Sequence, residues 1–225
     1  MFSAANAVAC RFQRSYIILL RRRSAVNELI DPLLGALALG IFFGFDAASL
    51  ARRAFLKRGI LIATSLLFFF ALTRILLYPA KLPLPTWCAP LGWLCGVLGG
   101  ALLLYSLALE LPFQRTYLAP DAPSQLITTG TYALTSHPGV LWLGLLLIGL
   151  LLASRARPLL IAVPLWLAID VLYVWLQDRF FFPRQFPDYG RYQRQTPMLW
   201  PNRRSLRRCW ETLPWRRREP SSPHT

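Results

Sequence analysis

The sequence predicts an all-α, polytopic membrane helix bundle with about five transmembrane helices and a cytoplasmic C-terminal segment. Of its 225 residues, 55% are hydrophobic and only 16% are charged, a balance that a soluble domain of this size rarely has. The chain also contains five apolar runs whose lengths approach the roughly 20 residues that a spanning helix needs. The net charge of +15 is concentrated near the ends of these runs and in the C-terminal segment. The chain therefore requires lipid as part of its solvent.

A basic N-terminal segment, residues 1–28, precedes the membrane domain. Its apolar patch at 16–20 is too short to cross a bilayer. Three arginines at 21–23 follow this patch in place of the small-residue cleavage site of a signal peptide. We therefore expect an interfacial or disordered segment here, with the membrane domain covering residues 29–202.

Five apolar runs predict the membrane helices, and they cover residues 32–50, 59–78, 90–109, 139–154 and 158–176. The fourth run is the shortest. Only residues 155–157 separate it from the fifth, and so short a connection forces an antiparallel hairpin. In the third run Gly92, Gly96 and Gly100 recur every fourth residue. Such a stripe of small residues lets another helix approach closely, so we expect a packing seam there.

The basic residues predict the orientation of the bundle. Four lie between the first and second runs, and eleven arginines follow the fifth. Basic loops favour the cytoplasmic side, so we expect both regions there, together with the loop 110–138. Five crossings then place the arginines that precede the first helix outside, against the same rule. Residues 203–225 are expected to form a basic tail that is disordered or lies on the lipid headgroups, with anionic membrane lipids as its partner. Nucleic acid is not an expected partner.

The four cysteines, Cys10, Cys88, Cys95 and Cys209, form no C-x-x-C pair and have no histidine at ligand spacing. This pattern indicates neither a metal site nor a disulfide framework.

Ionisable side chains inside the spans are few: Asp46, Arg74 and Asp170. Such groups are costly in the hydrocarbon region and seldom face lipid. They indicate either a polar cavity within the bundle or a structural ion pair between Arg74 and one of the two aspartates. The sequence alone does not select the partner.

The segment 125–144 reads QLITTGTYALTSHPGVLWLG and passes from a polar loop directly into the fourth run. The pattern Leu-Ile-Thr-Thr-Gly-x-Tyr, followed by His-Pro at the start of an apolar helix, resembles a family of membrane methyltransferases. This family is typified by isoprenylcysteine carboxyl methyltransferase and phospholipid N-methyltransferases.

A second block adds to the resemblance. The fifth run continues into Gln177-Asp178 and then into Phe186, Tyr189, Tyr192 and the Thr196-Pro197 pair. This order is similar to the family's acidic pair, aromatic residue, two tyrosines and proline. The resemblance covers residues 126–201, about a third of the chain.

The resemblance implies transfer of a methyl group from S-adenosylmethionine to a lipid or lipid-modified acceptor that carries a carboxylate, amine or hydroxyl. It implies a cytoplasmic cofactor site between the His-Pro loop and the end of the fifth helix. Asp178 is then the catalytic residue, and the cofactor-binding residues are Gly130, Tyr132, His137, Pro138, Gln177, Tyr189 and Tyr192.

The residue types at this implied site suit such a ligand. Gly130 allows a close backbone approach, His137 offers ring nitrogens for hydrogen bonds, and Pro138 fits the first turn of a helix. Asp178 is suited to bind the cofactor's ammonium group or to balance its sulfonium charge. Methyl transfer needs no metal and no covalent enzyme intermediate, so the protein's tasks are positioning and exclusion of water.

Two departures from the family pattern keep other functions open. Ser136 and Val140 stand where the family usually has an arginine and a tyrosine, and Gln177 replaces one carboxylate of the acidic pair. A sterol-type membrane reductase that uses NADPH is one alternative, although the Asn-Tyr continuation after His-Pro is missing. A membrane scaffold that has lost the chemistry is another. Tyr189 and Tyr192 are equally suited to be interfacial anchors.

Overall fold

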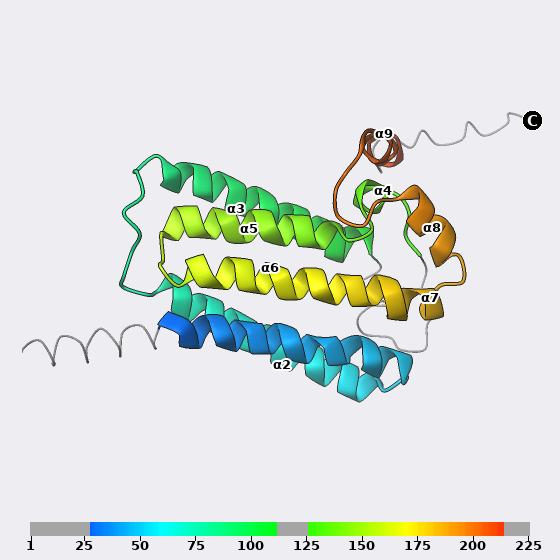
Figure 1. Ribbon diagram of the computed structural model, residues 1–225, viewed down its shortest axis with the longest axis horizontal. Coiled ribbons are helices and arrows are strands. Elements are labelled where there is room, and N and C mark those ends of the chain that lie inside the picture. The colour runs from blue at the N-terminus through cyan, green and yellow to red at the C-terminus, as the bar shows by residue number, and fades with distance from the viewer. Residues whose placement is uncertain (1–27, 112–125, 214–225) are drawn as a thin grey trace, which may run out of the picture.

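A computed structural model describes residues 28–111 and 126–213 of the chain, and the described part is helical, with no β-strand. Five long helices run side by side along one direction (Figure 1). The predicted all-α helix bundle is therefore confirmed. The long helices are the N-terminal helix Glu28–Leu50, α2 Ala54–Leu76, α3 Cys88–Leu104 with its π-helical extension η1 Tyr105–Glu110, α5 Pro138–Ser154, and α6 Leu159–Leu176 with its extensions η3 Gln177–Phe181 and α7 Phe182–Gln185.

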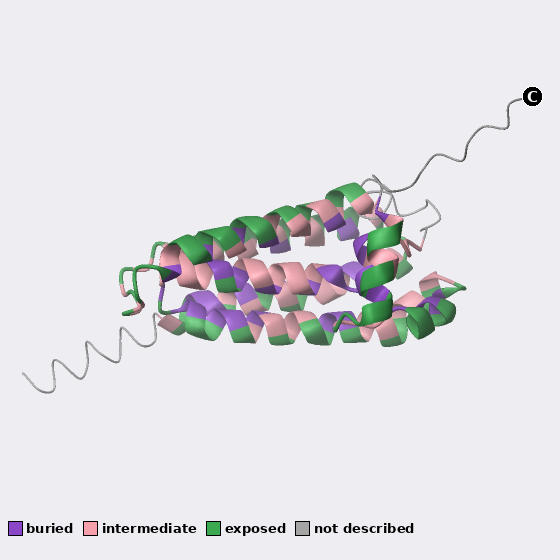
Figure 2. Cartoon of the chain, turned by 90° about the horizontal axis from the view of Figure 1, so that it is seen from above, coloured by how far each residue is buried: buried purple, intermediate pink, exposed green. Residues whose placement is uncertain are grey.

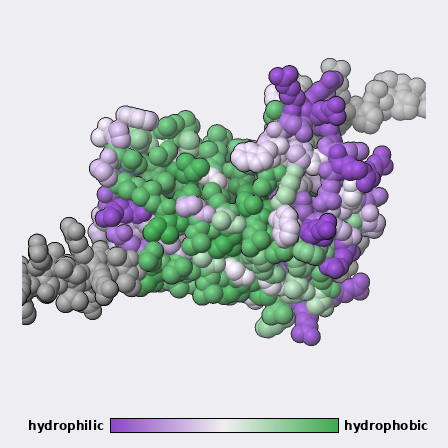
Figure 3. All heavy atoms as spheres, in the orientation of Figure 1, coloured by the Kyte–Doolittle hydropathy of each residue, from purple (hydrophilic) through white to green (hydrophobic). Residues whose placement is uncertain are grey.

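The surface of the bundle is that of an integral membrane protein. In the part of the chain that the structure describes, four helices are long and apolar enough to cross a membrane, at Glu28–Leu50, Ala54–Leu76, Cys88–Glu110 and Leu159–Gln185, whereas α5 is shorter. Hydrophobic side chains cover the middle of the molecule and hydrophilic ones gather at both ends (Figure 3). Large apolar residues such as Leu66, Phe69 and Leu98 are exposed along this band, where lipid satisfies them. The chain is therefore a multi-pass membrane protein.

Local backbone geometry explains where the helices begin and end. Pro138 occupies the first turn of α5, where its missing N–H costs nothing. Arg155 ends the same helix in the left-handed conformation, with φ of 55°. The chain then reverses direction within the four residues 155–158 into α6, so the predicted antiparallel hairpin is confirmed. Arg52 makes a similar turn between the N-terminal helix and α2, with φ of 54°.

A seam of glycines joins α3 to α5. Gly92, Gly96 and Gly99 are buried on α3. Gly92 and Gly96 face Gly149 of α5, and Gly99 faces the α5 backbone at residues 142–146. A Cβ atom on Gly149 would collide with the backbone of Gly96. The predicted seam is confirmed, with Gly99 in place of Gly100, which contacts only the Leu146 side chain. Close backbone approach of this kind replaces the hydrophobic effect as a source of packing energy in lipid.

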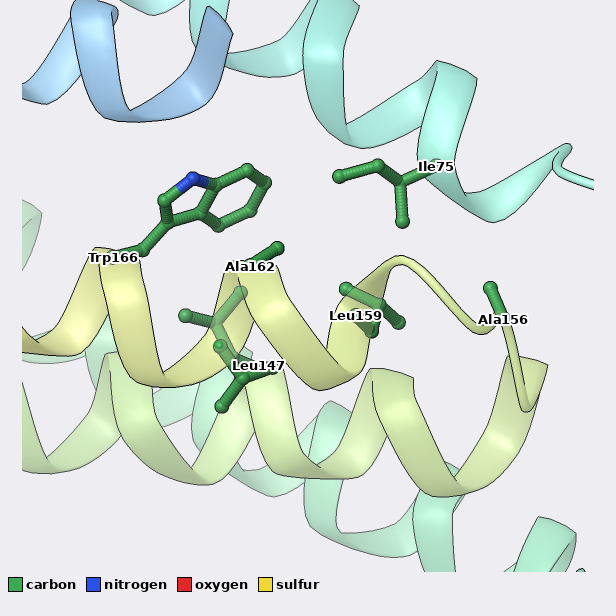
Figure 4. Packing of buried hydrophobic residues seen from close by; sticks show 7 residues of the cluster. Ile75, Leu147, Ala156, Leu159, Ala162 and Trp166 are labelled. Atoms are coloured by element: carbon green, nitrogen blue, oxygen red, sulfur yellow. The ribbon is translucent and has the colours of Figure 1, made fainter. Parts of the chain in front are cut away.

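Trp166 of α6 is the largest fully buried side chain of the described residues. Its indole Nε1 donates a hydrogen bond to the carbonyl of Pro32 at 2.8 Å, which ties α6 to the N-terminal helix. The ring packs on Phe68 of α2, with centroids 4.7 Å apart. Figure 4 shows Trp166, Ala162 and Leu159 of α6 between Leu147 of α5 and Ile75 of α2. This cluster forms the apolar core at one half of the bundle.

Arg74 forms an ion pair with Asp31, with Nε and Oδ1 2.6 Å apart. Both predicted partners, Asp46 and Asp170, are therefore wrong. The N-terminal helix begins at Glu28 rather than 32, and α2 runs antiparallel to it, so the start of one helix lies beside the end of the other. Asp46 is 15 residues further along the N-terminal helix, about 22 Å from Asp31 at the usual helical rise.

Three short helices gather at the end of the bundle opposite the chain's first described residue (Figure 1): α4 Thr131–Leu134, α8 Tyr189–Gln195 and α9 Arg203–Thr212. The structure differs here from the expected disordered tail at 203–225. Residues 203–212 form a helix because Asn202 and Ser205 cap its N-terminus reciprocally, with hydrogen bonds of 2.9 and 3.0 Å. Residues 1–27, 112–125 and 214–225, with the expectations that concern them, lie outside the described residues.

The glycine seam predicts opposite effects for two matched substitutions. Gly149→Ala is expected to lower the free energy of unfolding by about 1–3 kcal/mol, because the new methyl group meets backbone that cannot move aside. Gly40→Ala in the N-terminal helix, where a Cβ has no neighbour within 4 Å, is expected to be neutral or to stabilise by up to about 1 kcal/mol. Thermal unfolding in detergent measures both. Equal effects would contradict the seam.

Candidate functional site

A cavity of about 1120 Å³ lies among the N-terminal helix, α2, α5, α6 and the short helices at their end. One part of its wall is apolar and is formed by side chains such as Leu39, Leu61 and Phe68. The other part carries ionisable and polar side chains. These include Asp46, Arg52, Lys57, Tyr132, Ser136, His137, Asp170, Tyr173, Gln177, Arg184, Tyr189 and Tyr192. The cavity therefore joins a polar chamber to an apolar space within the bundle.

A three-residue network forms one side of the polar chamber. The Nε2 atom of His137 lies 2.7 Å from Oδ1 of Asp178, and the hydroxyl of Tyr189 donates a hydrogen bond to the same oxygen. The residues come from the start of α5, from η3 and from α8, which are distant in the sequence. All three side chains are largely buried. The sequence analysis proposed all three as site residues, and the structure brings them together.

Asp178 itself does not line the cavity, whereas His137 and Tyr189 do. Its carboxylate lies behind them and accepts their hydrogen bonds, while its backbone carbonyl accepts one from Gln193 at 3.2 Å. Phe182 stacks on the His137 ring, with centroids 5.7 Å apart. In this arrangement Asp178 positions the two groups that face the cavity.

The backbone around His137 is also fixed from outside the helices. The amide of Ser136 donates to the carbonyl of Pro197 at 2.9 Å, and the amide of His137 donates to that of Met198 at 3.3 Å. These bonds satisfy amides that precede the first turn of α5. The segment between α8 and α9 therefore supports the His-Pro pair directly.

A second network surrounds Asp46. The Tyr173 hydroxyl and the Gln177 amide both donate to its Oδ2 atom, at 2.7 and 2.8 Å. Lys57 is buried nearby, with its Nζ 4.9 Å from the centroid of the Phe45 ring, and its positive charge acts on Asp46. Gln177, a proposed cofactor-binding residue, lines the cavity and orients this carboxylate.

Asp170 is the third carboxylate close to this space. It lies on the same face of α6 as Tyr173 and Gln177, at intervals of three and four residues, and it lines the cavity. Within residues 28–111 and 126–213 its carboxylate makes no hydrogen bond or ion pair. Such a group is available to a cationic ligand.

Tyr132 and Tyr192 close the chamber at its outer end. The Tyr192 hydroxyl donates to the backbone carbonyl of Tyr132 at 2.6 Å, which joins α8 to α4. Burial and the negative charge of Asp178 raise the pKa of Tyr192 above its ordinary value. Burial raises the pKa of Tyr189 as well, and its hydrogen bond to Asp178 raises it further. Both hydroxyl groups therefore remain protonated donors at neutral pH.

Gly130, like Asp178, is a proposed site residue that does not line the main cavity. It lines a separate space of about 410 Å³ with Tyr105, Glu110 and Thr212. Its φ is 63°, and a Cβ atom would collide with the Glu110 carboxylate. Its amide donates to the Thr212 hydroxyl at 2.9 Å. Gly130 therefore joins α4 to α9.

The Glu110 carboxylate anchors the start of α4. It accepts hydrogen bonds from the amide of Thr131, at 2.9 and 3.0 Å, and from that residue's hydroxyl. Burial raises the pKa of the Cys209 thiol on α9, and the charge of Glu110 raises it further. A single carboxylate thus orders the contact between η1, α4 and α9.

Sequence reasoning missed Tyr173 and Lys57. The signal for Tyr173 was present, because Asp170, Tyr173 and Gln177 follow helical spacing and mark a polar stripe on an otherwise apolar helix. Lys57 was interpreted only as one of the four basic residues between the first two apolar runs, which predict the orientation of the bundle. Its burial follows from α2 beginning at Ala54, which places it one turn inside the helix.

No family model, curated protein or solved structure matches this chain. The family resemblance therefore stays a prediction carried by the two sequence blocks described above.

Two substitutions of Asp178 distinguish the contribution of its hydrogen bonds to stability from the contribution of its charge. Asp178→Ala leaves the buried donors of His137 and Tyr189 without an acceptor, which is expected to lower the free energy of unfolding by about 1–3 kcal/mol. Asp178→Asn keeps an acceptor oxygen at the same place and is expected to cost clearly less. For a chain of this size each kcal/mol shifts the unfolding midpoint by about 2–4 °C, which thermal melts resolve. Equal losses would mean that charge, rather than the hydrogen bonds, maintains the network.

Proposed function

We propose that this protein is an integral membrane methyltransferase that transfers a methyl group from S-adenosylmethionine to a lipid-like acceptor. The observation that carries the proposal is the cavity. It combines a chamber of hydrogen-bonding and acidic groups with an apolar space between membrane helices. A polar cofactor and a lipid acceptor need these two environments in contact. The His-Pro and Tyr-x-x-Tyr motifs that suggested the family lie on the polar side.

The residues of the chamber fit the cofactor. Its sulfonium and ammonium groups are cationic, and Asp46 and Asp170 both line the cavity. Phe182 and Phe186 add aromatic surfaces beside His137 that suit a purine ring. The volume exceeds the usual 300–1000 Å³ of a small-molecule site, so an acceptor headgroup has room beside the cofactor. When bound, S-adenosylmethionine supplies an activated methyl group.

The protein's own contribution is positioning. Asp178 fixes the His137 ring and the Tyr189 hydroxyl, and both side chains are held in a largely buried, low-dielectric space. The second ring nitrogen of His137 and the lone pairs of the Tyr189 oxygen are thereby fixed, and such groups orient ligands without reorganisation during the reaction. The apolar wall formed by Leu61 and Phe68 accommodates an acyl or prenyl chain and excludes water.

We further propose that the cavity opens to the cytoplasm. The turn between the N-terminal helix and α2 lies at the same end of the bundle as α8 and α9 (Figure 1). Exposed arginines concentrate there, among them Arg52, Arg53, Arg191 and Arg203. The positive-inside rule assigns such an end to the cytoplasmic face.

Binding of S-adenosylmethionine tests the proposed activity. Calorimetry on the detergent-purified protein is expected to show saturable binding that His137→Ala abolishes and Asp178→Ala weakens. Arg157→Ala, at the opposite end of the bundle, is the matched control and should bind as the wild type does. NADPH serves as the control ligand, because its binding in place of S-adenosylmethionine would favour the reductase. Absence of both in a folded sample would favour a scaffold.

Cysteine labelling in cells tests the orientation. In a background with the four native cysteines replaced by alanine, Pro83→Cys lies in the α2–α3 loop and Asp188→Cys lies just before α8. A membrane-impermeant maleimide is expected to label position 83 on intact cells and position 188 only after permeabilisation. The reverse pattern would place the cavity on the outer face.

A further inference from the structure

Helix α9 has two large apolar side chains that are more than half exposed on one of its faces. Leu206 and Trp210 are one helical turn apart and are 54% and 55% exposed. Ser205 and Leu213 are buried, and the Thr212 hydroxyl accepts the hydrogen bond from Gly130. The helix therefore packs on one face and presents Leu206 and Trp210 on a second.

A third face of α9 is basic. Arg203, Arg204 and Arg207 are exposed. Arg207 pairs with Glu211 at 2.7 Å, and in the part of the chain that the structure describes the other two guanidinium groups form no ion pair. At 100° per residue the apolar stripe lies between the packed face and this basic face. An apolar stripe bordered by arginines is typical of a helix in the lipid headgroup region.

The direction of α9 agrees with such a location. The long helices run horizontally in Figure 1, where α9 is seen end-on, and after a quarter turn in Figure 2 α9 runs across the bundle. Its axis is thus roughly perpendicular to the membrane helices and parallel to the membrane plane. It lies near the end of α3 and η1, where the apolar band gives way to hydrophilic side chains (Figure 3). Trp200, just before α9, is 82% exposed.

We infer that α9 is an interfacial helix that binds the surface of an anionic membrane. Leu206 and Trp210 insert at the boundary between headgroups and acyl chains, while Arg203 and Arg204 contact lipid phosphate and carboxylate groups. Charge complementarity favours this occupant over a protein surface, since each arginine near an anionic leaflet gains roughly 1 kcal/mol. This role is independent of methyl transfer.

Membrane binding by α9 also affects residues that support the cavity. Pro197 and Met198, whose carbonyls accept the amides of Ser136 and His137, lie a few residues before α9. Arg208 donates to the carbonyl of Gln195 at 3.0 Å and fixes α9 to the end of α8. Binding of α9 to the headgroups therefore holds the segment that supports the His-Pro pair.

Spin-label accessibility in nanodiscs tests the inference on the full chain. Leu206→Cys, Trp210→Cys and the matched control Glu211→Cys are each made in a background without native cysteines and labelled with a nitroxide. In discs of phosphatidylcholine and phosphatidylserine, labels at 206 and 210 should collide with oxygen and be protected from an aqueous nickel complex. The label at 211 should show the reverse. Equal exposure of all three to nickel would overturn the inference.

A second arm tests the charge. Arg203→Gln with Arg204→Gln should lower the ratio of inserted to detached α9 about fivefold for each charge removed, and only in discs containing phosphatidylserine. The matched control is Arg155→Gln with Arg157→Gln, at the opposite end of the bundle, which should change nothing. Labels excluded from both reagents, or broadened by a neighbouring label, would mean that protein or a second copy covers the stripe. Insertion unaffected by phosphatidylserine would overturn the anionic specificity.

Discussion

The length of α5 is the constraint on which the site depends. Its 17 residues span about 26 Å, less than the hydrocarbon thickness of a typical bilayer, whereas the helices beside it are longer by six to ten residues. A helix this short does not reach both membrane surfaces, and the glycine seam fixes its position along α3. Its N-terminus at His137 therefore stops short of the ends of the neighbouring helices. The polar chamber occupies the space beyond this N-terminus, and α4, α7 and α8 enclose it.

Much of the fold was accessible from the sequence because lipid imposes simple rules. Apolar runs of helical length predicted all five helices, and the three-residue connection predicted the hairpin. The ion pair of Arg74 was not accessible, since the choice of Asp31 depends on where the N-terminal helix begins. Four residues decide that point, and hydropathy does not resolve helix ends so finely. The helix α9 was not predicted because its composition is that of a disordered tail. Its helical structure depends on one N-terminal cap, formed by Asn202 and Ser205.

The candidate site was predictable as a set of residues but not as a geometry. The two motif blocks contained His137, Asp178, Tyr189 and Tyr192, and these lie together. The position of Asp178 behind the cavity rather than in its wall was not predictable, because it depends on the rotation of α6 and its extension. Gly130 was expected to allow a close backbone approach to a ligand, whereas in the structure its positive φ serves the contact of α4 with α9.

The adjacent residues Gln177 and Asp178 belong to two different networks, one with Asp46 and one with His137 and Tyr189. They can do so because η3 begins at this point, and a π-helical turn holds one more residue than an α-helical turn. Among relatives of this chain, an insertion or deletion in α6 ahead of Gln177 would rotate both side chains away from their partners at once. The segment 170–178 is therefore expected to tolerate changes of side chain more readily than changes of length, and the two networks should be lost or retained together in evolution.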